Sequence, residues 1–280
     1  MVKIVTDSTA DLPKELAAQH GIHVVPLTIF FGEEAYKDGI DLTPETFLEK
    51  LKAAKDLPTT SQPSPGDFAQ VYKNLTEDGS EVVSIHLSSA LSGTYQSAVM
   101  GKDMVEGASI FVIDTKSATI GVGIMVLEAA KMAVTGASGA EVAEHVQRLV
   151  SQSSLHLAVD TLEYLQKGGR IGRAQGLLGS LLNIKPILYL VDGVMTPAEK
   201  VRGFNKALAR MAELVLAQIM PEDKVIYGVA HIASPQGAEI VMQKVRERYP
   251  NAEFLVYDGG PVIGAHVGPG TVGLIAQKII

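Results

Sequence analysis

The sequence contains, at residues 81–94, the run Glu81-Val82-Val83-Ser84-Ile85-His86-Leu87-Ser88-Ser89-Ala90-Leu91-Ser92-Gly93-Thr94. Its first half has the length and the β-branched content of a buried strand. Its second half is a loop of hydroxyl residues and glycine, and helical spacing follows over residues 95–104. A buried strand that leads through a polar loop into a helix indicates α/β layering around a largely parallel sheet.

The same alternation continues on both sides of this run. The expected strands are residues 2–6, 23–31, 110–114 and 155–160, and the expected helices include residues 117–134 and 139–151. Thr43-Pro44-Glu45 opens a further helix, because proline is favoured at the first helical position. This half of the chain is therefore expected to be a parallel sheet flanked by helices.

Beyond Asp160 the pattern changes. Asp192-Gly193 between two apolar runs predicts a β-hairpin with a two-residue turn. A helix over 204–220, a strand over 225–233, a helix over 235–249 and a strand over 253–257 follow, and a glycine-rich loop comes next. We therefore expect an N-terminal α/β domain over residues 1–157, a smaller C-terminal α/β domain over residues 158–280, and a ligand site between them.

The composition narrows the class of function. The 280 residues carry 24 Lys and Arg against 31 Asp and Glu, a formal net charge of −7. This acidic balance argues against nucleic-acid binding, which needs a basic surface. The absence of cysteine excludes disulfides, thiolate catalysis and zinc–thiolate sites. The sequence shows no signal peptide, no membrane-length apolar run and no clustered metal ligands, so we expect a soluble cytoplasmic protein without a metal.

Two loops offer hydroxyl groups to a ligand. In Pro58-Thr59-Thr60-Ser61-Gln62-Pro63-Ser64-Pro65-Gly66, three prolines stiffen the backbone, and Ser64 is expected to cap the next helix. Thr60 and Ser61 remain available. In the loop 88–94, Ser92 and Gly93 precede a helix, where backbone N–H groups favour an anion. This second loop is the best candidate for an anion site.

A third loop, residues 258–271, contains His266 between glycines. Because glycine has no side chain, we expect His266 to be poorly covered by its neighbours. Its imidazole can donate a hydrogen bond to an oxyanion.

A basic window adds an electrostatic feature. Residues 165–202 contain six Lys and Arg against two acidic residues, a net +4, so the rest of the chain carries −11. Such a window suits a docking surface for phosphate or an acidic partner, although it can also be a solvated face.

Several segments together resemble the DegV family. They are Val5-Thr6-Asp7-Ser8-Thr9-Ala10-Asp11-Leu12, Thr60-Ser61-Gln62-Pro63, Leu91-Ser92-Gly93-Thr94-Tyr95-Gln96-Ser97-Ala98, Lys167-Gly168-Gly169-Arg170-Ile171 and Gly264-Ala265-His266-Val267-Gly268-Pro269-Gly270-Thr271. The resemblance spans essentially the whole chain. It implies a protein of two α/β domains that binds a long-chain fatty acid such as palmitate, stearate or oleate. In its FakB-type members, a partner fatty acid kinase converts the carboxylate to an acyl phosphate, a step connected with phospholipid synthesis.

By the same resemblance, Thr60 and Ser92 hold the carboxylate, Ser61 and Gly93 lie beside them, and His266 completes the polar end. It further associates a group of arginines with the polar end or with kinase docking, namely Arg170, Arg173 and Arg202. It implies no catalytic residue, cofactor or metal. Two other classes of function stay open: an enzyme that uses Asp7, Ser8 or His266 as nucleophile or phosphoryl acceptor, and a regulatory protein that binds another small anion.

Overall fold

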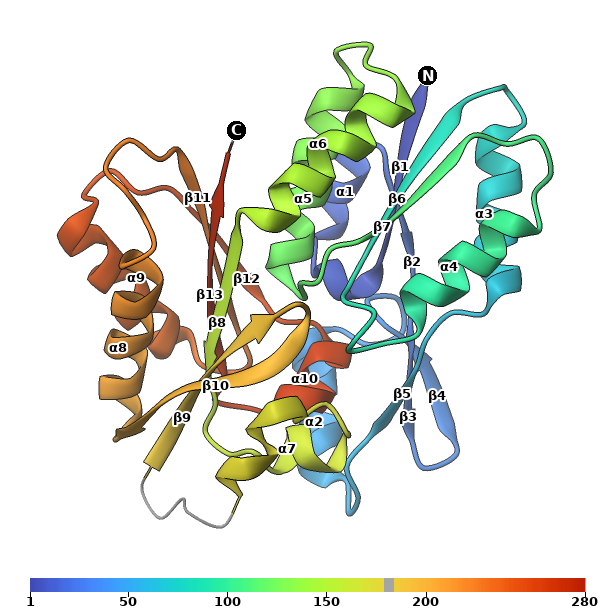
Figure 1. Ribbon diagram of the computed structural model, residues 1–280. Coiled ribbons are helices and arrows are strands. Elements are labelled where there is room, and N and C mark those ends of the chain that lie inside the picture. The colour runs from blue at the N-terminus through green and yellow to red at the C-terminus, as the bar shows by residue number, and fades with distance from the viewer. Residues whose placement is uncertain (179–183, 280) are drawn as a thin grey trace.

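The computed structural model describes residues 1–178 and 184–279. The chain forms two α/β units that lie side by side, as Figure 1 shows. Three sheets of four, six and three strands make up the two units. The expected α/β architecture is confirmed. Residues 177–182 form an apolar run in the sequence, and most of this run lies outside the described residues.

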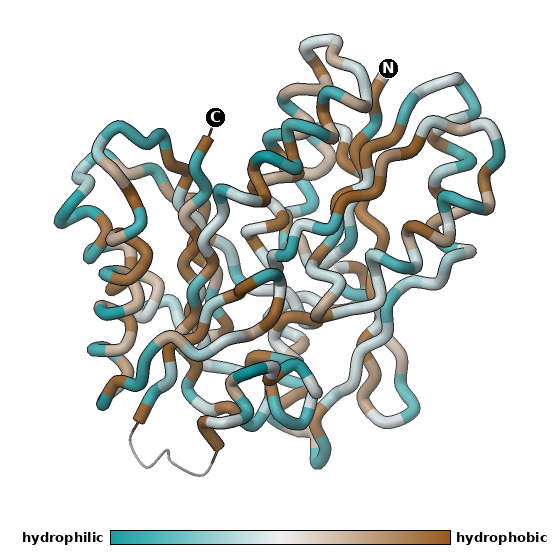
Figure 2. Tube along the Cα trace, viewed as in Figure 1, coloured by the Kyte–Doolittle hydropathy of each residue, from teal (hydrophilic) through white to brown (hydrophobic). Residues whose placement is uncertain are grey.

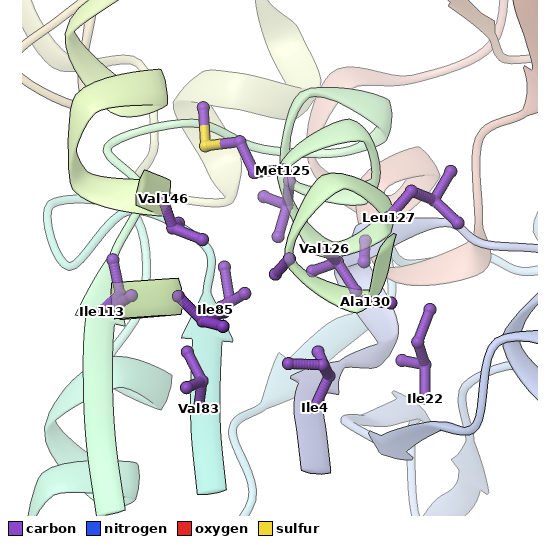
Figure 3. Packing of buried hydrophobic residues seen from close by; sticks show 14 of the residues in the cluster. Ile4, Ile22, Val83, Ile85, Ile113, Met125, Val126, Leu127, Ala130 and Val146 are labelled. Carbon is purple, nitrogen blue, oxygen red and sulfur yellow. The ribbon is translucent and has the colours of Figure 1, made fainter. Parts of the chain in front are cut away.

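The four-stranded sheet has the order β2-β1-β6-β7, and all its strands are parallel. Its strands are β1 (Val2–Asp7), β2 (Ile22–Val25), β6 (Glu81–His86) and β7 (Ile110–Asp114). Side chains such as Val83 and Ile85 are fully buried, because helices cover both faces. One face packs on α1 (Lys14–Gln19), α5 (Ile120–Ala133) and α6 (Gly139–Ser151), and the other on α3 (Pro65–Thr76) and α4 (Thr94–Asp103). Figure 3 shows the core on the α5 side.

A small antiparallel sheet extends this unit. It consists of β3 (Thr28–Phe31), β4 (Glu34–Lys37) and β5 (Thr59–Ser61), with α2 (Pro44–Ala53) nearby. The single strand expected over residues 23–31 is wrong, since β2 and β3 belong to different sheets. Pro26 lies between them, and a proline cannot donate a backbone hydrogen bond to the ladder. The expected helix start at Thr43 is confirmed, because Thr43 and Thr46 form a capping box.

The six-stranded sheet has the order β10-β9-β8-β13-β11-β12, and β11 and β12 form its parallel pair. Its strands are β8 (Ser153–Ala158), β9 (Ile184–Val191), β10 (Val194–Arg202), β11 (Val225–His231), β12 (Phe254–Asp258) and β13 (Val272–Lys278). The predicted hairpin is confirmed: Asp192 and Gly193 have φ values of 50° and 78°, as a two-residue turn of this kind requires. Residue 157 falls inside β8, so the proposed domain boundary lies within a strand of this sheet.

Two helices, α8 (Phe204–Leu216) and α9 (Pro235–Arg248), cover the outer face of the six-stranded sheet. The inner face turns toward the first unit, and α5 packs between the two sheets. Figure 2 shows brown, hydrophobic strands in both sheets and teal positions on the outward sides of these helices. Among the described residues, no helix has the length and hydrophobicity to span a membrane.

Short helices occupy the region where the two units meet. They are η1 (Ser8–Ala10), α7 (Glu163–Lys167), η2 (Gly172–Leu177) and α10 (Pro261–Val267). The glycine-rich segment expected to be a loop is therefore partly a helix, and the exposed position expected for His266 is wrong. Pro261 begins α10 at a favourable position, and Gly268, with a φ of 78°, ends it.

Candidate functional site

A deep apolar pocket, which we call the tunnel, lies between the two units and has an empty volume of about 860 Å³ including its mouth. Its wall is almost entirely carbon. The lining includes Leu27, Leu87, Leu91, Ala118, Leu155, Leu157, Leu165, Leu190, Met195, Ala230, Ile232, Val262, Ile263, Val267 and Gly273. An apolar cavity of this kind suits a ligand that is mostly hydrocarbon.

The floor of the tunnel is the inner face of the six-stranded sheet. Ala230 of β11 and Gly273 of β13 line the tunnel, whereas Val229, Val272 and Leu274 pack on the opposite face against α8 and α9. This division follows from the strand geometry, since successive side chains point to opposite faces. Gly273 has no Cβ, which leaves open space above the centre of the sheet.

The polar end of the tunnel joins residues from both units. Thr60 of β5 and His266 of α10, 206 positions apart in the sequence, are bonded through Oγ1 and Nε2 at 2.7 Å. Both side chains line the tunnel, as do Ser92 and Arg170. We refer to Thr60, Ser92, Arg170 and His266 as the head site. The structure thus brings together four of the eight residues that the sequence assigned to ligand or partner binding.

The imidazole of His266 is neutral near pH 7. Burial, reinforced by the positive charge of Arg170, lowers the pKa of His266 to about 4. Its Nδ1 atom is buried without a hydrogen-bond partner and faces Gly168, where a Cβ would lie 2.5 Å from it. A hydrogen on Nδ1 would be an unsatisfied buried donor, so we assign the hydrogen to Nε2, which donates to Thr60 Oγ1. The hydroxyl hydrogen of Thr60 then remains free for a ligand.

Ser92 lies in the loop between β6 and α4, as expected. Its Oγ contacts Thr94 Oγ1 at 2.9 Å and accepts from the Thr94 backbone N–H at 3.3 Å. Gly93 precedes α4, and a Cβ there would lie 2.3 Å from Nε2 of Gln62. Glycine at this position therefore lets the loop 88–94 approach the segment that carries Thr60. Gly93 acts through this close packing and does not line the tunnel.

Arg170 is held in a fixed position at the head site. Its Nε donates to the carbonyl of Leu91 at 2.9 Å, and one terminal nitrogen donates to the carbonyl of Gly168 at 2.7 Å. The other two predicted arginines, Arg173 and Arg202, are exposed and do not line the tunnel. The structure therefore separates the three arginines into one that lies at the head site and two on the surface.

Ser61 is also separated from the tunnel. It follows Thr60 on β5, its side chain is exposed, and its hydroxyl donates to the carbonyl of Gln62 at 3.2 Å. Adjacent residues of a strand point to opposite faces, so Thr60 and Ser61 cannot both face the tunnel. The assignment of Ser61 to carboxylate binding stays a prediction that this geometry does not favour.

Thr119 is a tunnel residue that the sequence analysis missed. It precedes α5 with a φ of 51° and a ψ of −142°, a conformation that is unfavourable for a β-branched residue. Its hydroxyl donates to Asp11 Oδ2 at 2.6 Å. Backbone strain of this kind is concentrated at functional sites, but nothing in the local sequence marks Thr119 as strained.

Two buried carboxyl groups lie beneath the start of α10. A Cβ at Gly260 would lie 2.6 Å from Asp11 Oδ1 and 3.6 Å from Asp38 Oδ1. Burial raises the pKa of Asp11, and burial raises the pKa of Asp38 to about 7. Asp38 is only 3% exposed. The two carboxyl groups pack beneath α10, the helix that carries His266. Their ionisation lowers the free energy of unfolding, because the charged form is disfavoured by burial.

We expect Asp38→Asn to change the pH dependence of stability. The pKa of Asp38 in the folded protein lies above its ordinary value of 3.8, so the folded state binds more protons than the unfolded state between about pH 4 and pH 7. Asp38 therefore lowers the free energy of unfolding as the pH rises through this range. Urea unfolding at about pH 5 and at about pH 8 measures this effect. From the lower to the higher pH, the unfolding free energy of the Asn variant should rise by about 2–3 kcal/mol relative to that of wild type.

Asp103→Asn, at an exposed position, is the control for this measurement. Its unfolding free energy should follow that of wild type at both pH values. If Asp38→Asn also follows wild type, the carboxyl of Asp38 is not buried as the structure has it.

A buried polar chain also resembles a nucleophilic triad. Ser84 Oγ lies 2.7 Å from His86 Nε2, and His86 Nδ1 lies 2.8 Å from Asp7 Oδ2. All three side chains are fully buried, and Tyr72 donates to the same serine at 2.8 Å. A nucleophile must reach its substrate, and none of the three lines the tunnel. We therefore interpret this series of hydrogen bonds as structural, since it provides partners for polar side chains that are buried inside the parallel sheet.

Comparison with known proteins places these features in a family. A family model described as an uncharacterised protein of the DegV family matches residues 1–278. A DegV domain-containing protein of Halalkalibacterium halodurans is 41% identical over 98% of this chain and 97% of its own length.

Two solved structures are similar over nearly their whole length. A DegV family protein of Thermus thermophilus, described by its fatty acid binding, has a TM-score of 0.93 and 37% identity, with 99% of each chain covered. A stearic acid-binding protein of Eubacterium ventriosum has a TM-score of 0.90 and 29% identity, with 99% of this chain and 98% of that one covered.

Proposed function

The chain belongs to the DegV family, and from this membership we propose that it binds a long-chain fatty acid, with the acyl chain in the tunnel and the carboxylate at the head site. The observation that carries the proposal is the hydrogen-bonded pair of Thr60 and His266, which lines an otherwise largely apolar cavity together with Ser92 and Arg170. Relatives described as fatty acid-binding proteins support the same ligand class. Palmitate, stearate and oleate are the ligands that we expect.

The physical balance of such a complex is favourable. Each buried methylene contributes about 0.8 kcal/mol, so a chain of about fourteen methylenes offers on the order of 11 kcal/mol before the costs of binding. The carboxylate must be hydrogen-bonded, because an unpaired buried anion would cancel much of this gain. Thr60 and Ser92 supply neutral hydroxyl donors, and the guanidinium of Arg170 supplies a nearby positive charge.

We further propose that the protein is a carrier, without catalysis of its own, that presents the carboxylate to a fatty acid kinase in the cytoplasm. In that reaction a carboxylate oxygen forms a bond to the γ-phosphorus of ATP while the bond from that phosphorus to ADP breaks. The carboxylate lies at the mouth of the tunnel in this arrangement, and no side chain needs to bond to it covalently. The acyl phosphate would then serve phospholipid synthesis.

Solvent extraction of the purified protein, followed by mass spectrometry of the lipids, tests the proposal. A stoichiometric long-chain fatty acid is the expected result. A different small anion in its place would favour the regulatory alternative. Incubation with ATP alone should leave the protein mass unchanged, whereas self-phosphorylation or turnover without a partner would favour the enzyme alternative.

Loss of either head-site hydroxyl should weaken fatty-acid binding. We expect Thr60→Val and Ser92→Ala each to cost about 1–3 kcal/mol, because a buried charged acceptor loses a hydrogen-bond donor. The double variant should cost less than the sum, since both hydroxyls serve one carboxylate. Titration with a fluorescent fatty acid measures these affinities, and Ser61→Ala serves as the matched control, which should bind like wild type. Wild-type affinity in the double variant would place the carboxylate elsewhere.

A further inference from the structure

The hairpin of β9 and β10 reaches from the six-stranded sheet toward the first unit, as Figure 1 shows. Its end, residues 190–195, is here called the hairpin tip. Leu190 and Met195 are cross-strand partners in the tip, and both line the tunnel. The pairing of β9 with β8 ends at Tyr189, so the tip extends beyond the part of the sheet that holds the rest of the hairpin. This wall of the tunnel therefore depends on other contacts to stay in place.

A second cavity borders the hairpin tip on the side of α6. It is polar, it lies between the tip, the end of α6 and the start of β8, and its empty volume is about 910 Å³ including the solvent at its opening. Leu155 and Leu190 line both this cavity and the tunnel, so their side chains lie between the two spaces. The cavity gives the hairpin tip room to move away from the tunnel.

Ser88 fastens the hairpin tip to the first unit. Its side chain is 1% exposed, and its Oγ donates to the carbonyl of Gly193 at 3.0 Å, across 105 positions of the sequence. The two residues are so close that a Cβ at Gly193 would lie 2.0 Å from Ser88 Oγ. The neighbouring ion pair of Lys116 with Asp192, at 3.7 Å, is more than half exposed, and such pairs are weak. The buried hydrogen bond is the stronger contact, because breaking it leaves a buried donor and acceptor without partners.

Resting on the proposed function, we propose that Ser88 is a positioning residue that holds the hairpin tip closed over the acyl chain, so that its bond to Gly193 limits the rate at which the fatty acid leaves the tunnel. Ser88 belongs to the same loop as Ser92 of the head site, and its backbone carbonyl accepts from the Ser92 N–H at 3.1 Å. A substitution of the Ser88 side chain retains this backbone bond. Ser92 therefore serves the carboxylate, whereas the Ser88 side chain acts on the wall beside the hydrocarbon.

The dissociation of a fluorescent long-chain fatty acid, displaced by excess palmitate in a stopped-flow experiment, tests this role. Ser88→Ala removes the donor, and Gly193→Ala opens the same contact from the opposite side, since its methyl group would collide with Ser88 Oγ. We expect each variant to release the probe about ten-fold faster than wild type or more. Ser89→Ala is the matched control, because Ser89 bonds to Asp114 within the first unit and does not line the tunnel.

A cross-link beside the same contact distinguishes this role from a general loss of stability. The chain has no cysteine, so Lys116→Cys/Asp192→Cys introduces its only two thiols, at exposed positions outside the tunnel. In the Ser88→Ala background, joining these thiols with a short bismaleimide should return the dissociation rate to within about three-fold of wild type. The same protein without the linker should stay fast.

Unchanged dissociation in Ser88→Ala and Gly193→Ala, or fast dissociation that the cross-link does not slow, would refute the role of Ser88 and leave the fatty-acid site in place. Thermal unfolding checks that each variant is folded. If Ser88→Ala does not fold, Gly193→Ala with the same cross-link provides the test. If neither the probe nor palmitate binds to wild type, the proposed function itself fails.

Discussion

Replacing Gly273 with leucine is expected to block part of the tunnel and to weaken palmitate binding about 100-fold. Gly273 lies in β13 on the tunnel floor, and a Cβ there would make ordinary contacts of 3.6–3.9 Å. A leucine can therefore be accommodated by the backbone, and its side chain would occupy the space of the acyl chain. Excluding about four methylenes would cost about 3 kcal/mol, a loss of about 100-fold in affinity.

Fluorescence titration with palmitate and with a shorter fatty acid measures this effect. Gly273→Ala, which adds one methyl group, is the graded control and should show a much smaller loss. A shorter acid should be less affected than palmitate, because less of its chain reaches the obstruction. Thermal unfolding should show that the leucine variant is folded, and wild-type palmitate affinity in such a variant would exclude this cavity as the acyl site.

Reversing the charge of two surface arginines is expected to separate binding from presentation. Arg173→Glu/Arg202→Glu should leave palmitate affinity within about two-fold of wild type, because both residues are exposed and neither lines the tunnel. Acyl-phosphate formation with the proposed fatty acid kinase should fall by about ten-fold or more at low salt, since rim charges act mainly on the association rate. Raising the salt should slow the wild-type reaction more than that of the variant.

Arg170→Glu provides the contrast in the same pair of assays. It removes two partly buried hydrogen bonds and places a carboxylate against the ligand carboxylate, so palmitate binding should weaken by about 3 kcal/mol or more. If the double surface variant instead forms acyl phosphate at the wild-type rate at every salt concentration, the basic window of residues 165–202 is only a solvated face. Loss of palmitate binding in the surface variant would indicate that Arg173 or Arg202 contributes to carboxylate binding.

Local sequence signals predicted most helices and strands because their physical causes lie within a few residues. The capping box at Ser64, the proline at the start of α2 and the Asp192-Gly193 turn each act on their own neighbours. The error at residues 23–31 has a local cause too, since Pro26 interrupts the run. The error at His266 came from counting glycines, although Pro261 can begin a helix there.

The head site was predicted in part from the residues and in part from a family resemblance. The hydroxyl loops marked Thr60 and Ser92 as ligand candidates, and the resemblance assigned them to one carboxylate. The sequence could not separate Arg170 from Arg173, which are neighbours in the chain. Their difference arises because Arg170 bonds to the carbonyl of Leu91, 79 positions away, while Arg173 faces solvent.

The amino-acid sequence was sufficient to predict the α/β layering, the membership of the DegV family and the residue types at the polar end of the tunnel. The tertiary structure alone decided that Thr60 and His266 meet, that Ser61 turns away, and that the inner face of the six-stranded sheet forms the tunnel floor. The reason is the range of the interactions involved. Caps, turns and strand periodicity depend on adjacent residues, whereas a cavity between two units depends on how distant segments pack, and no short stretch of sequence encodes that packing.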